Sequence, residues 1–246
     1  MSGIKVARGK RLRATRVDRC GLPQAGEKAQ LVTKGFVSLK LANQWKDGED
    51  LEQTNADGEI CVNDRTAPQL KYTQVDGVFC EVDIELFNMF TGNTMILDGA
   101  QKPIGFWQDK TVNTEVGVAL ELWSGTAGSD CVEPVDDSVL TAGAATREYG
   151  YWLVPAIVEA TIGDIEIGAS VATFTLSGRA VSAPMWGKGP YNVIGSGAAG
   201  AAGRLYSPIG KDRPWGFMRT NVAPPAITDG AQELTLPTPY FAPATP

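Results

Sequence analysis

Residues 69–92 constrain the fold more than any other stretch, because they join a strand pattern to a helix pattern without a gap. In the first half, apolar side chains alternate between two sides, with Leu70, Tyr72, Val78 and Cys80 on one side and Val75 and Phe79 on the other. This alternation predicts a strand that is buried on much of both faces. The Asp76-Gly77 pair fits either a tight hairpin turn or a glycine bulge in one long strand, and we expect the single strand.

The period changes at Asp83, where the sequence predicts a short α-helix of about residues 83–91. The Asp83 carboxylate is suited to accept hydrogen bonds from the first free backbone amides, and Glu85 is well placed against the positive end of the helix dipole. Leu86 and Phe90 lie four residues apart on one face, and Gly92 supplies the left-handed residue that ends the helix. So short a helix is not stable alone in water, and we expect it to pack on a sheet.

The rest of the chain predicts a mainly β protein, a β-sandwich or split barrel. Short segments of alternating polarity, bounded by Gly, Pro, Asn and Asp, recur along the sequence, and amphipathic stretches of helix length are nearly absent. With 246 residues and a hydrophobic fraction of 43%, the chain is large enough for one substantial core. We expect further strands over residues 31–41, 111–123, 149–160, 162–167 and 171–181.

Three regions are expected along the chain: a basic N-terminal arm at 1–20, a single β domain at 21–222, and a proline-rich C-terminal arm at 223–246. The last region holds six of the 15 prolines, which favours an extended segment. Two long polar loops are expected within the domain, at 42–59 and 124–147. The first contains two Asp-Gly pairs, and a loop of this length is usually functional, with a mobile surface hairpin as the alternative.

The net charge of −6 hides an uneven distribution. The first 20 residues contain seven basic side chains against Asp18 alone, so the remaining residues carry 15 basic and 27 acidic side chains, a balance of −12. A solvated terminus or a nucleic-acid tail would account for the arm, but an acidic body argues against a protein that grips phosphates over a large surface. An arm that docks on an acidic neighbouring subunit explains both halves.

Targeting signals and metal-binding patterns are not apparent in the sequence. No apolar segment follows the basic start and no run reaches about 18 apolar residues, so we expect no membrane anchor and assembly in the cytoplasm. The four cysteines, Cys20, Cys61, Cys80 and Cys131, lack CxxC spacing, and the chain has no histidine. We therefore expect no metal site and buried or free thiols, with a Cys20–Cys61 bridge as the alternative.

Two patterns are similar to catalytic or cofactor sites. Residues 195–200 have GxGxxG spacing after an apolar stretch, as in dinucleotide-binding enzymes, but Pro208 leaves little room for the helix that this motif requires. Glu81, Asp83 and Glu85 offer neighbouring carboxylates, but local spacing does not place two of them across a substrate. Without histidine, the usual general base is missing. We expect no enzyme activity and no cofactor.

Several short motifs occur in order along almost the whole chain. They are TRVD at 15–18 with Cys20-Gly21, VTKGFVSL at 32–39, DGED at 47–50, NADGEICV at 55–62, LFNMFTG at 86–92, Gly105-Phe106 and VAPP at 222–225. This ordered set resembles the major tail proteins of long-tailed bacteriophages that infect actinobacteria. The resemblance implies the tail-tube fold, with one short helix on the flank of the β domain. It also implies a structural virion protein whose hexameric rings stack into a hollow tail tube for DNA ejection.

The resemblance further implies partners and a location. Copies of the chain are expected to bind one another, and the tube is expected to bind the tape measure, terminator and distal tail proteins, in the virion tail. Genomic DNA is expected to pass through without specific binding. An acidic lumen suits this passage because it repels phosphates.

Contact residues follow as a hypothesis from the basic arm and the polar loop. The arm is expected to lie on a neighbouring subunit and the loop to reach an adjacent ring, through Arg8, Arg11, Arg13, Arg16, Trp45, Asp47, Glu49, Asp50 and Asp57. Glu115 and Glu121 share the polar side of a predicted strand and are the candidates for the lumen, with ordinary solvent exposure as the alternative. Two other functions stay open: a capsid-surface or receptor-binding β module, and a dinucleotide-binding oxidoreductase that uses residues 195–200.

Overall fold

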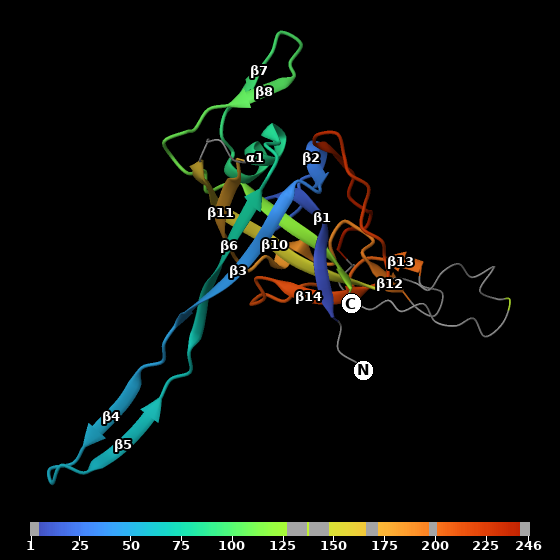
Figure 1. Cartoon of the computed structure of the whole chain (residues 1–246). Helices are drawn as coiled ribbons and strands as arrows, with labels where there is room; N and C mark the ends of the chain where they lie inside the picture. The colour runs from blue at the N-terminus through green and yellow to red at the C-terminus, as the bar shows by residue number, and fades with distance from the viewer. Residues whose placement is uncertain (1–4, 127–136, 138–147, 166–171, 197–200, 242–246) are drawn as a thin grey trace.

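A computed structural model describes residues 5–126, 137, 148–165, 172–196 and 201–241 (Figure 1). Within these residues the protein is mainly β with antiparallel strands and one short α-helix, which confirms the predicted fold class. The helix α1 covers Ile84–Thr91, and a 3-10 turn η1 covers Pro184–Trp186. The strands are β1 Val6–Val17, β2 Gly26–Thr33, β3 Phe36–Lys46, β4 Asp50–Thr54, β5 Ile60–Arg65, β6 Gln69–Phe79, β7 Met95–Leu97, β8 Pro103–Phe106, β9 Gly117–Thr126, β10 Tyr149–Ile165, β11 Phe174–Ala180, β12 Ile194–Ser196, β13 Ala201–Gly203, β14 Gly216–Thr220 and β15 Gln232–Leu234.

A nine-stranded antiparallel sheet forms the body of the described part of the molecule. Its strand order is β15-β2-β1-β9-β10-β11-β6-β3, and β14 pairs with the first residues of β10. Strand β10 is 17 residues long and pairs with β9, β11 and β14 along its length. The three remaining pairs, β4–β5, β7–β8 and β12–β13, are two-stranded hairpins outside this sheet.

The central strands of the sheet are buried on both faces. Because side chains alternate along a strand, β1 directs Leu12 and Ala14 toward a core beneath α1, and Val17 toward a second core on the opposite face. Trp123 of β9 and Tyr151 of β10 belong to the second core, which the segment 183–209 covers. This two-sided burial explains why β9 is buried along almost its whole length.

Helix α1 forms as its terminal residues predict. The Oδ1 atom of Asp83 accepts hydrogen bonds from the backbone amides of Glu85 (3.0 Å) and Leu86 (3.1 Å), and Gly92 ends the helix at φ 67°. Phe87 and Phe90 pack edge-to-face on Phe79 of β6. The helix therefore caps the core over the end of the strand that precedes it, as expected.

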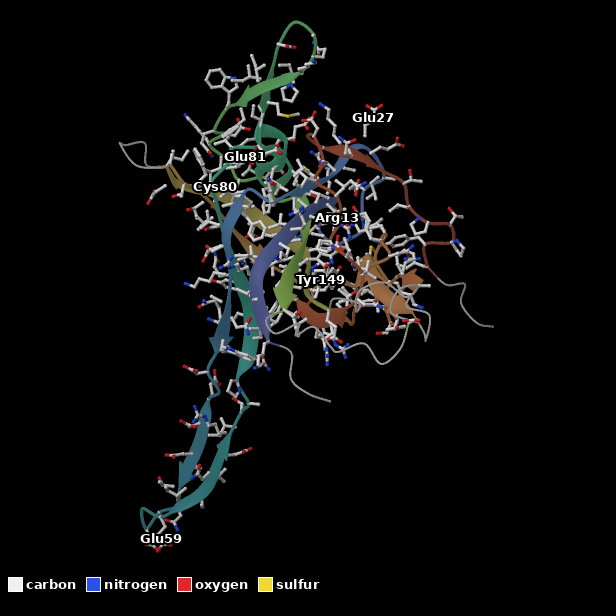
Figure 2. All side chains as sticks on the ribbon, turned by 45° about the vertical axis from the view of Figure 1, so that its right-hand side comes forward. Arg13, Glu27, Glu59, Cys80, Glu81 and Tyr149 are labelled. Carbon is white, nitrogen blue, oxygen red and sulfur yellow. The ribbon has the colours of Figure 1, made fainter. Side chains whose placement is uncertain are left out.

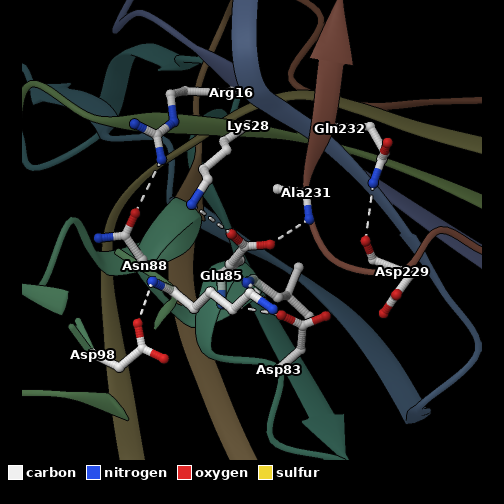
Figure 3. A network of polar contacts seen from close by, with 11 residues as sticks. Arg16, Lys28, Asp83, Glu85, Asn88, Asp98, Asp229, Ala231 and Gln232 are labelled. Carbon is white, nitrogen blue, oxygen red and sulfur yellow. Dashed lines mark hydrogen bonds and ion pairs between the residues drawn. The ribbon is translucent and has the colours of Figure 1, made fainter. Parts of the chain in front are cut away.

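Polar side chains tie α1 to both ends of the chain (Figure 3). Glu85 accepts a hydrogen bond from the backbone amide of Ala231 and pairs with Lys28 of β2 at 3.1 Å. Asn88 Oδ1 accepts a hydrogen bond from Arg16 of β1 at 3.0 Å. One short helix thus holds β1, β2 and the segment before β15 in place.

Several strand boundaries differ from the predictions. Residues 69–79 form one strand as expected, but Gly77 makes no bulge, since β6 and β11 pair there in continuous register. The predicted strand 31–41 is two strands, because the chain leaves β1 at Lys34 and Gly35 and then pairs with β6. The predicted strand 111–123 begins only at Gly117. The two strands predicted over 149–167 are a single strand, β10, in the residues described.

The prediction of an N-terminal arm at residues 1–20 is wrong for most of that region. Residues 6–17 form β1, which lies between β2 and β9 in the sheet. Between its basic residues, β1 buries Leu12 and Ala14 on one face and Val17 on the other. The described part of the C-terminal region, up to residue 241, is mostly irregular but packs on its own body: β15 pairs with β2, and Leu234 is buried.

The loop expected at 42–59 is wrong in its secondary structure, and the alternative of a surface hairpin is the one that the structure shows. Strand β3 continues to Lys46, and residues 50–54 and 60–65 pair as the hairpin β4–β5. The physical reason is that polar side chains do not prevent strand pairing when both faces are solvated and a good turn joins the strands. Of the loop predicted at 124–147, the first three residues end β9, and apart from Asp137 and the start of this segment it lies outside the described residues.

We predict that Asp83→Ala lowers the free energy of unfolding by about 1 kcal/mol, because two amides at the start of α1 lose their acceptor. Burial raises the pKa of the Asp83 carboxyl above its ordinary value of 3.8, so the folded protein binds the carboxyl proton more tightly than the unfolded chain does. The contribution of Asp83 to the free energy of unfolding therefore falls as the pH rises above 3.8. Asp83→Asn keeps the acceptor without a charge and should retain at least wild-type stability at pH 7. Urea denaturation of the three proteins tests this; equal losses for both variants would contradict it.

Candidate interaction surface

The β4–β5 hairpin projects far from the body at the end opposite β7–β8 (Figure 1). It continues the β3–β6 pair, whose last paired residues are Lys46 and Gln69. Every residue from 49 to 65 is exposed, so this segment contributes nothing to either core. We call residues 47–65 the acidic hairpin.

Local chemistry explains why the acidic hairpin forms. Asn55 Oδ1 accepts hydrogen bonds from the amides of Asp57 (3.0 Å) and Glu59 (2.8 Å), and Gly58 adopts φ 83°, which a glycine tolerates. At the base of the hairpin, Gly48 lies so close to Thr66 that an added Cβ would stand 1.7 Å from the Thr66 carbonyl oxygen. The tip is thus fixed by an asparagine turn and the base by a glycine.

Apolar side chains are displayed along this projection. Trp45 at its base is 56% exposed, and Leu51, Ile60 and Val62 are exposed on its strands. Leu51 and Val62 share one face by the register of β4 and β5, whereas Ile60 lies on the other. A ribbon with exposed apolar side chains on both faces and no contact with its own core is typical of a segment that binds another molecule.

The charge of the acidic hairpin equals that of the whole chain. It contains seven acidic residues and one basic residue, Arg65, for a balance of −6, and the full sequence also has a net charge of −6. Two of the carboxylates are in exposed ion pairs, Glu49 with Lys46 and Asp50 with Arg65. The side chains of Asp47, Glu52, Asp57, Glu59 and Asp64 form no ion pair with any described residue. Figure 2 shows Glu59 at the far end of the projection.

A second charged surface lies at the start of β1. Lys5, Arg8 and Lys10 are exposed and Arg11 is half-buried, and none of the four forms an ion pair with the described residues. Their backbone pairs with β9 on one side, while β2 reaches along β1 only to Leu12. We call residues 5–11 the basic edge, because this half of β1 has one unpaired side among the described strands.

The nine predicted contact residues separate into accessible and inaccessible groups. Arg8 and Arg11 lie on the basic edge, Arg16 is held by Asn88 beside α1, and Arg13 is buried. The five residues predicted on the loop are exposed and lie on the acidic hairpin or at its base: Trp45, Asp47, Glu49, Asp50 and Asp57. The prediction for Arg13 is therefore wrong, because its guanidinium has no access to a neighbouring subunit.

Arg13 instead forms a buried ion pair with Glu121, its direct neighbour on β9. Two guanidinium nitrogens donate to the two carboxylate oxygens, with Nη2 to Oε1 at 2.7 Å, and Tyr151 OH donates to Oε1 as well. The Arg13 guanidinium also lies over the ring of Tyr191, 3.3 Å from its centroid. Burial lowers the pKa of Arg13, but the charge and hydrogen bonds of Glu121 outweigh this and raise it overall. Burial and Glu121 raise the pKa of Tyr151, so its hydroxyl remains a donor.

The prediction that Glu121 faces a lumen is wrong. Glu121 is only 1% exposed, and its side chain points into the second core. Glu115 is exposed but precedes β9 in a loop, so the two carboxylates are not on one strand face. The strand predicted to start at residue 111 starts only at Gly117, so Glu115 lies before it.

The glycine-rich segment does not form a nucleotide-binding turn. Residues 194–196 and 201–203 pair antiparallel as β12 and β13, and residues 197–200 lie outside the described part. A dinucleotide site requires a helix directly after the glycines, so the second strand contradicts this alternative. Among the cysteines described, Cys20, Cys61 and Cys80 are free and exposed, so the Cys20–Cys61 bridge is not formed, and Cys131 lies outside the described residues.

The β7–β8 hairpin, the second projection in Figure 1, was not predicted from the sequence. Asp98 Oδ1 fixes its turn by accepting hydrogen bonds from the amides of Ala100 and Lys102, both at 2.8 Å. Ile104 on β8 is 60% exposed, and Trp107 directly after this strand is 64% exposed. The Asp98-Gly99 pair between two short apolar segments was a signal for this hairpin.

Comparisons with other proteins give no family. No protein-family model matches the sequence, and a search of curated proteins found no relative. Within the described residues, no group of three or more acidic or cysteine side chains is arranged to hold a metal ion. No described helix is long and apolar enough to cross a membrane.

We predict that Glu121→Gln lowers the free energy of unfolding by about 3–5 kcal/mol, because the charge of Arg13 is left buried without a counterion. The double variant Arg13→Met with Glu121→Leu removes both charges and should be more stable than Glu121→Gln alone. Urea denaturation gives both values.

Arg8→Met is the matched control, because Arg8 lies on the same strand but is exposed and unpaired. It should change stability by no more than about 0.5 kcal/mol. A Glu121→Gln variant as stable as this control would show that the ion pair does not hold β1 in the sheet.

Proposed function

We propose that this protein is a structural subunit that binds copies of itself, as hexameric rings stacked into the tail tube of a long-tailed bacteriophage. In this function it is a virion component that is assembled in the host cytoplasm and contacts other tail proteins at the ends of the tube. DNA passes through the tube without specific binding. The ordered motifs from TRVD at residue 15 to VAPP at residue 222 give the resemblance on which the phage assignment depends.

The observation that carries the self-association is the acidic hairpin. Ordering a segment costs about 1–2 kcal/mol per residue in backbone entropy, and this ribbon recovers none of that cost by packing on its own core. An isolated two-stranded hairpin is only marginally stable in water. Contacts with another subunit would supply the missing burial, and the exposed side chains of Trp45, Leu51, Ile60 and Val62 are available for it.

A polar sheet face supports the role as a conduit. On the face opposite the α1 core, polar side chains occupy the middle of β6 and β11: Asp76 accepts a hydrogen bond from Ser177 at 2.8 Å, and Arg179 pairs with Glu159 at 2.8 Å. Tyr72 and Val78 of β6 flank this polar centre on the same face. Lys40 of β3 lies opposite Asp76 in the register. Opposite charges alternate on this face, so it offers phosphates no strong attraction. We infer that this face, rather than Glu115 and Glu121, lines the lumen.

We predict that replacing residues 47–68 with Asn-Gly abolishes self-association and leaves the body folded. Lys46 and Gln69 are paired, so a two-residue turn can join them. Negative-stain electron microscopy at rising protein concentration should show rings or tubes with a central hole for the wild type and single particles for the variant. Circular dichroism and thermal unfolding establish that the variant is folded.

Cys61→Ser is the control on the same hairpin, because it keeps the length, charge and turn of the ribbon. It should assemble like the wild type. Tubes of normal appearance from the shortened variant would contradict the role of the hairpin. A wild type that stays a single copy at every concentration would contradict the proposed function.

A further inference from the structure

We propose that the acidic hairpin of one copy binds the basic edge of another copy. The inference rests on the proposed self-association and names the two surfaces that meet. It replaces the expectation that residues 5–19 as a whole dock on a neighbour, since Arg13 and Arg16 are occupied within their own chain. The accessible cations of β1 itself lie in residues 5–11, whereas Arg19 is exposed in the turn that follows this strand.

The first argument is charge. Five carboxylates on the acidic hairpin and four cations on the basic edge have no ion-pair partner among the described residues. The acidic hairpin carries −6 by itself, so its field attracts a cluster of cations and repels other acidic surfaces. Between exposed strands, opposite charges that face each other contribute roughly 0.2–1 kcal/mol per pair.

The second argument is the backbone. Residues 6–11 pair with β9 on one side only, and β4 and β5 pair only with each other among the described strands. Unpaired strand edges are templates for pairing with another chain. Both surfaces are therefore extended, unpaired and of opposite charge, and a strand of the ribbon can lie along the basic edge.

The third argument is that the two surfaces do not meet within one chain. The β4–β5 hairpin extends away from the body that contains β1, and Figure 2 shows Glu59 at its far end. No described ion pair joins them. The partner is therefore a second copy. Because the two surfaces differ, the contact is heterologous and can repeat from copy to copy.

A charge swap tests the inference. One variant reverses the basic edge with Arg8→Glu and Lys10→Glu, a second reverses the hairpin with Glu52→Lys and Glu59→Lys, and a third carries all four changes. All four side chains are exposed, so the fold should be retained. Sedimentation velocity at low and high salt measures the concentration at which each protein associates, and electron microscopy shows the product.

We expect each two-residue variant to need about tenfold more protein for association at low salt, and the four-residue variant to return to within about threefold of the wild type. The wild type should associate less readily at high salt, because at 1 M salt the attraction between exposed charges is screened over about 3 Å. Lys102→Glu with Lys110→Glu is the matched control: both lysines are exposed near β7–β8, and the net charge changes by the same amount as in the basic-edge variant. It should associate like the wild type.

The outcomes separate this inference from the proposed function. Wild-type rings or tubes, together with a charge swap that does not restore association, would overturn the inference and leave the proposed function in place. A basic-edge variant that loses binding to double-stranded DNA but associates normally would also overturn it, and would assign residues 5–11 to nucleic acid. A wild type that never associates would overturn both.

Discussion

The charge of Arg13 has to be neutralised inside the protein before β1 can occupy the centre of the sheet. An ion transferred from water to the protein interior costs several kcal/mol unless a counterion and hydrogen bonds replace its hydration. Glu121 supplies the counterion from the adjacent strand β9. The ring of Tyr191, which packs against the second core, covers the Arg13 guanidinium. The pairing of β1 with β9, and with it the two-sided core, depends on this contact.

Once β1 is fixed, both projections have a rigid base. The second core anchors β1, β9 and β10, and the first core places α1 against the same strands. Strands β3 and β6 extend beyond the first core as one antiparallel pair. This pair is the stem of the acidic hairpin. The β7–β8 hairpin follows α1 directly and leaves the body at the other end (Figure 1). The molecule therefore presents two different ends on one stiff sheet.

Local patterns in the sequence predicted the parts of the fold that local interactions decide. The helix was predictable within one residue, because Asp83 and Gly92 define its ends by chemistry that needs no distant partner. The centre of β1 was not predictable, because a strand that contains Arg11, Arg13 and Arg16 is stable inside a protein only if a distant acid accepts the charge. The Asp57-Gly58 pair allowed a hairpin between Asp50–Thr54 and Ile60–Arg65, but the polar side chains of these strands did not predict that they pair without a core to pack on. The sequence predicted the exposed contact residues from Trp45 to Asp57 on and beside the acidic hairpin. Of the predicted basic arm, only residues 5–11 belong to the basic edge.

The charge of the hairpin has a further consequence for the protein in solution. A ribbon whose two edges pair with no other described strand and which exposes Leu51, Ile60 and Val62 is the kind of segment that aggregates by pairing with its own kind. With seven carboxylates on each ribbon, two hairpins that approach side by side repel each other. The same residues that make the ribbon attractive to a basic surface therefore act as gatekeepers against amyloid-like stacking.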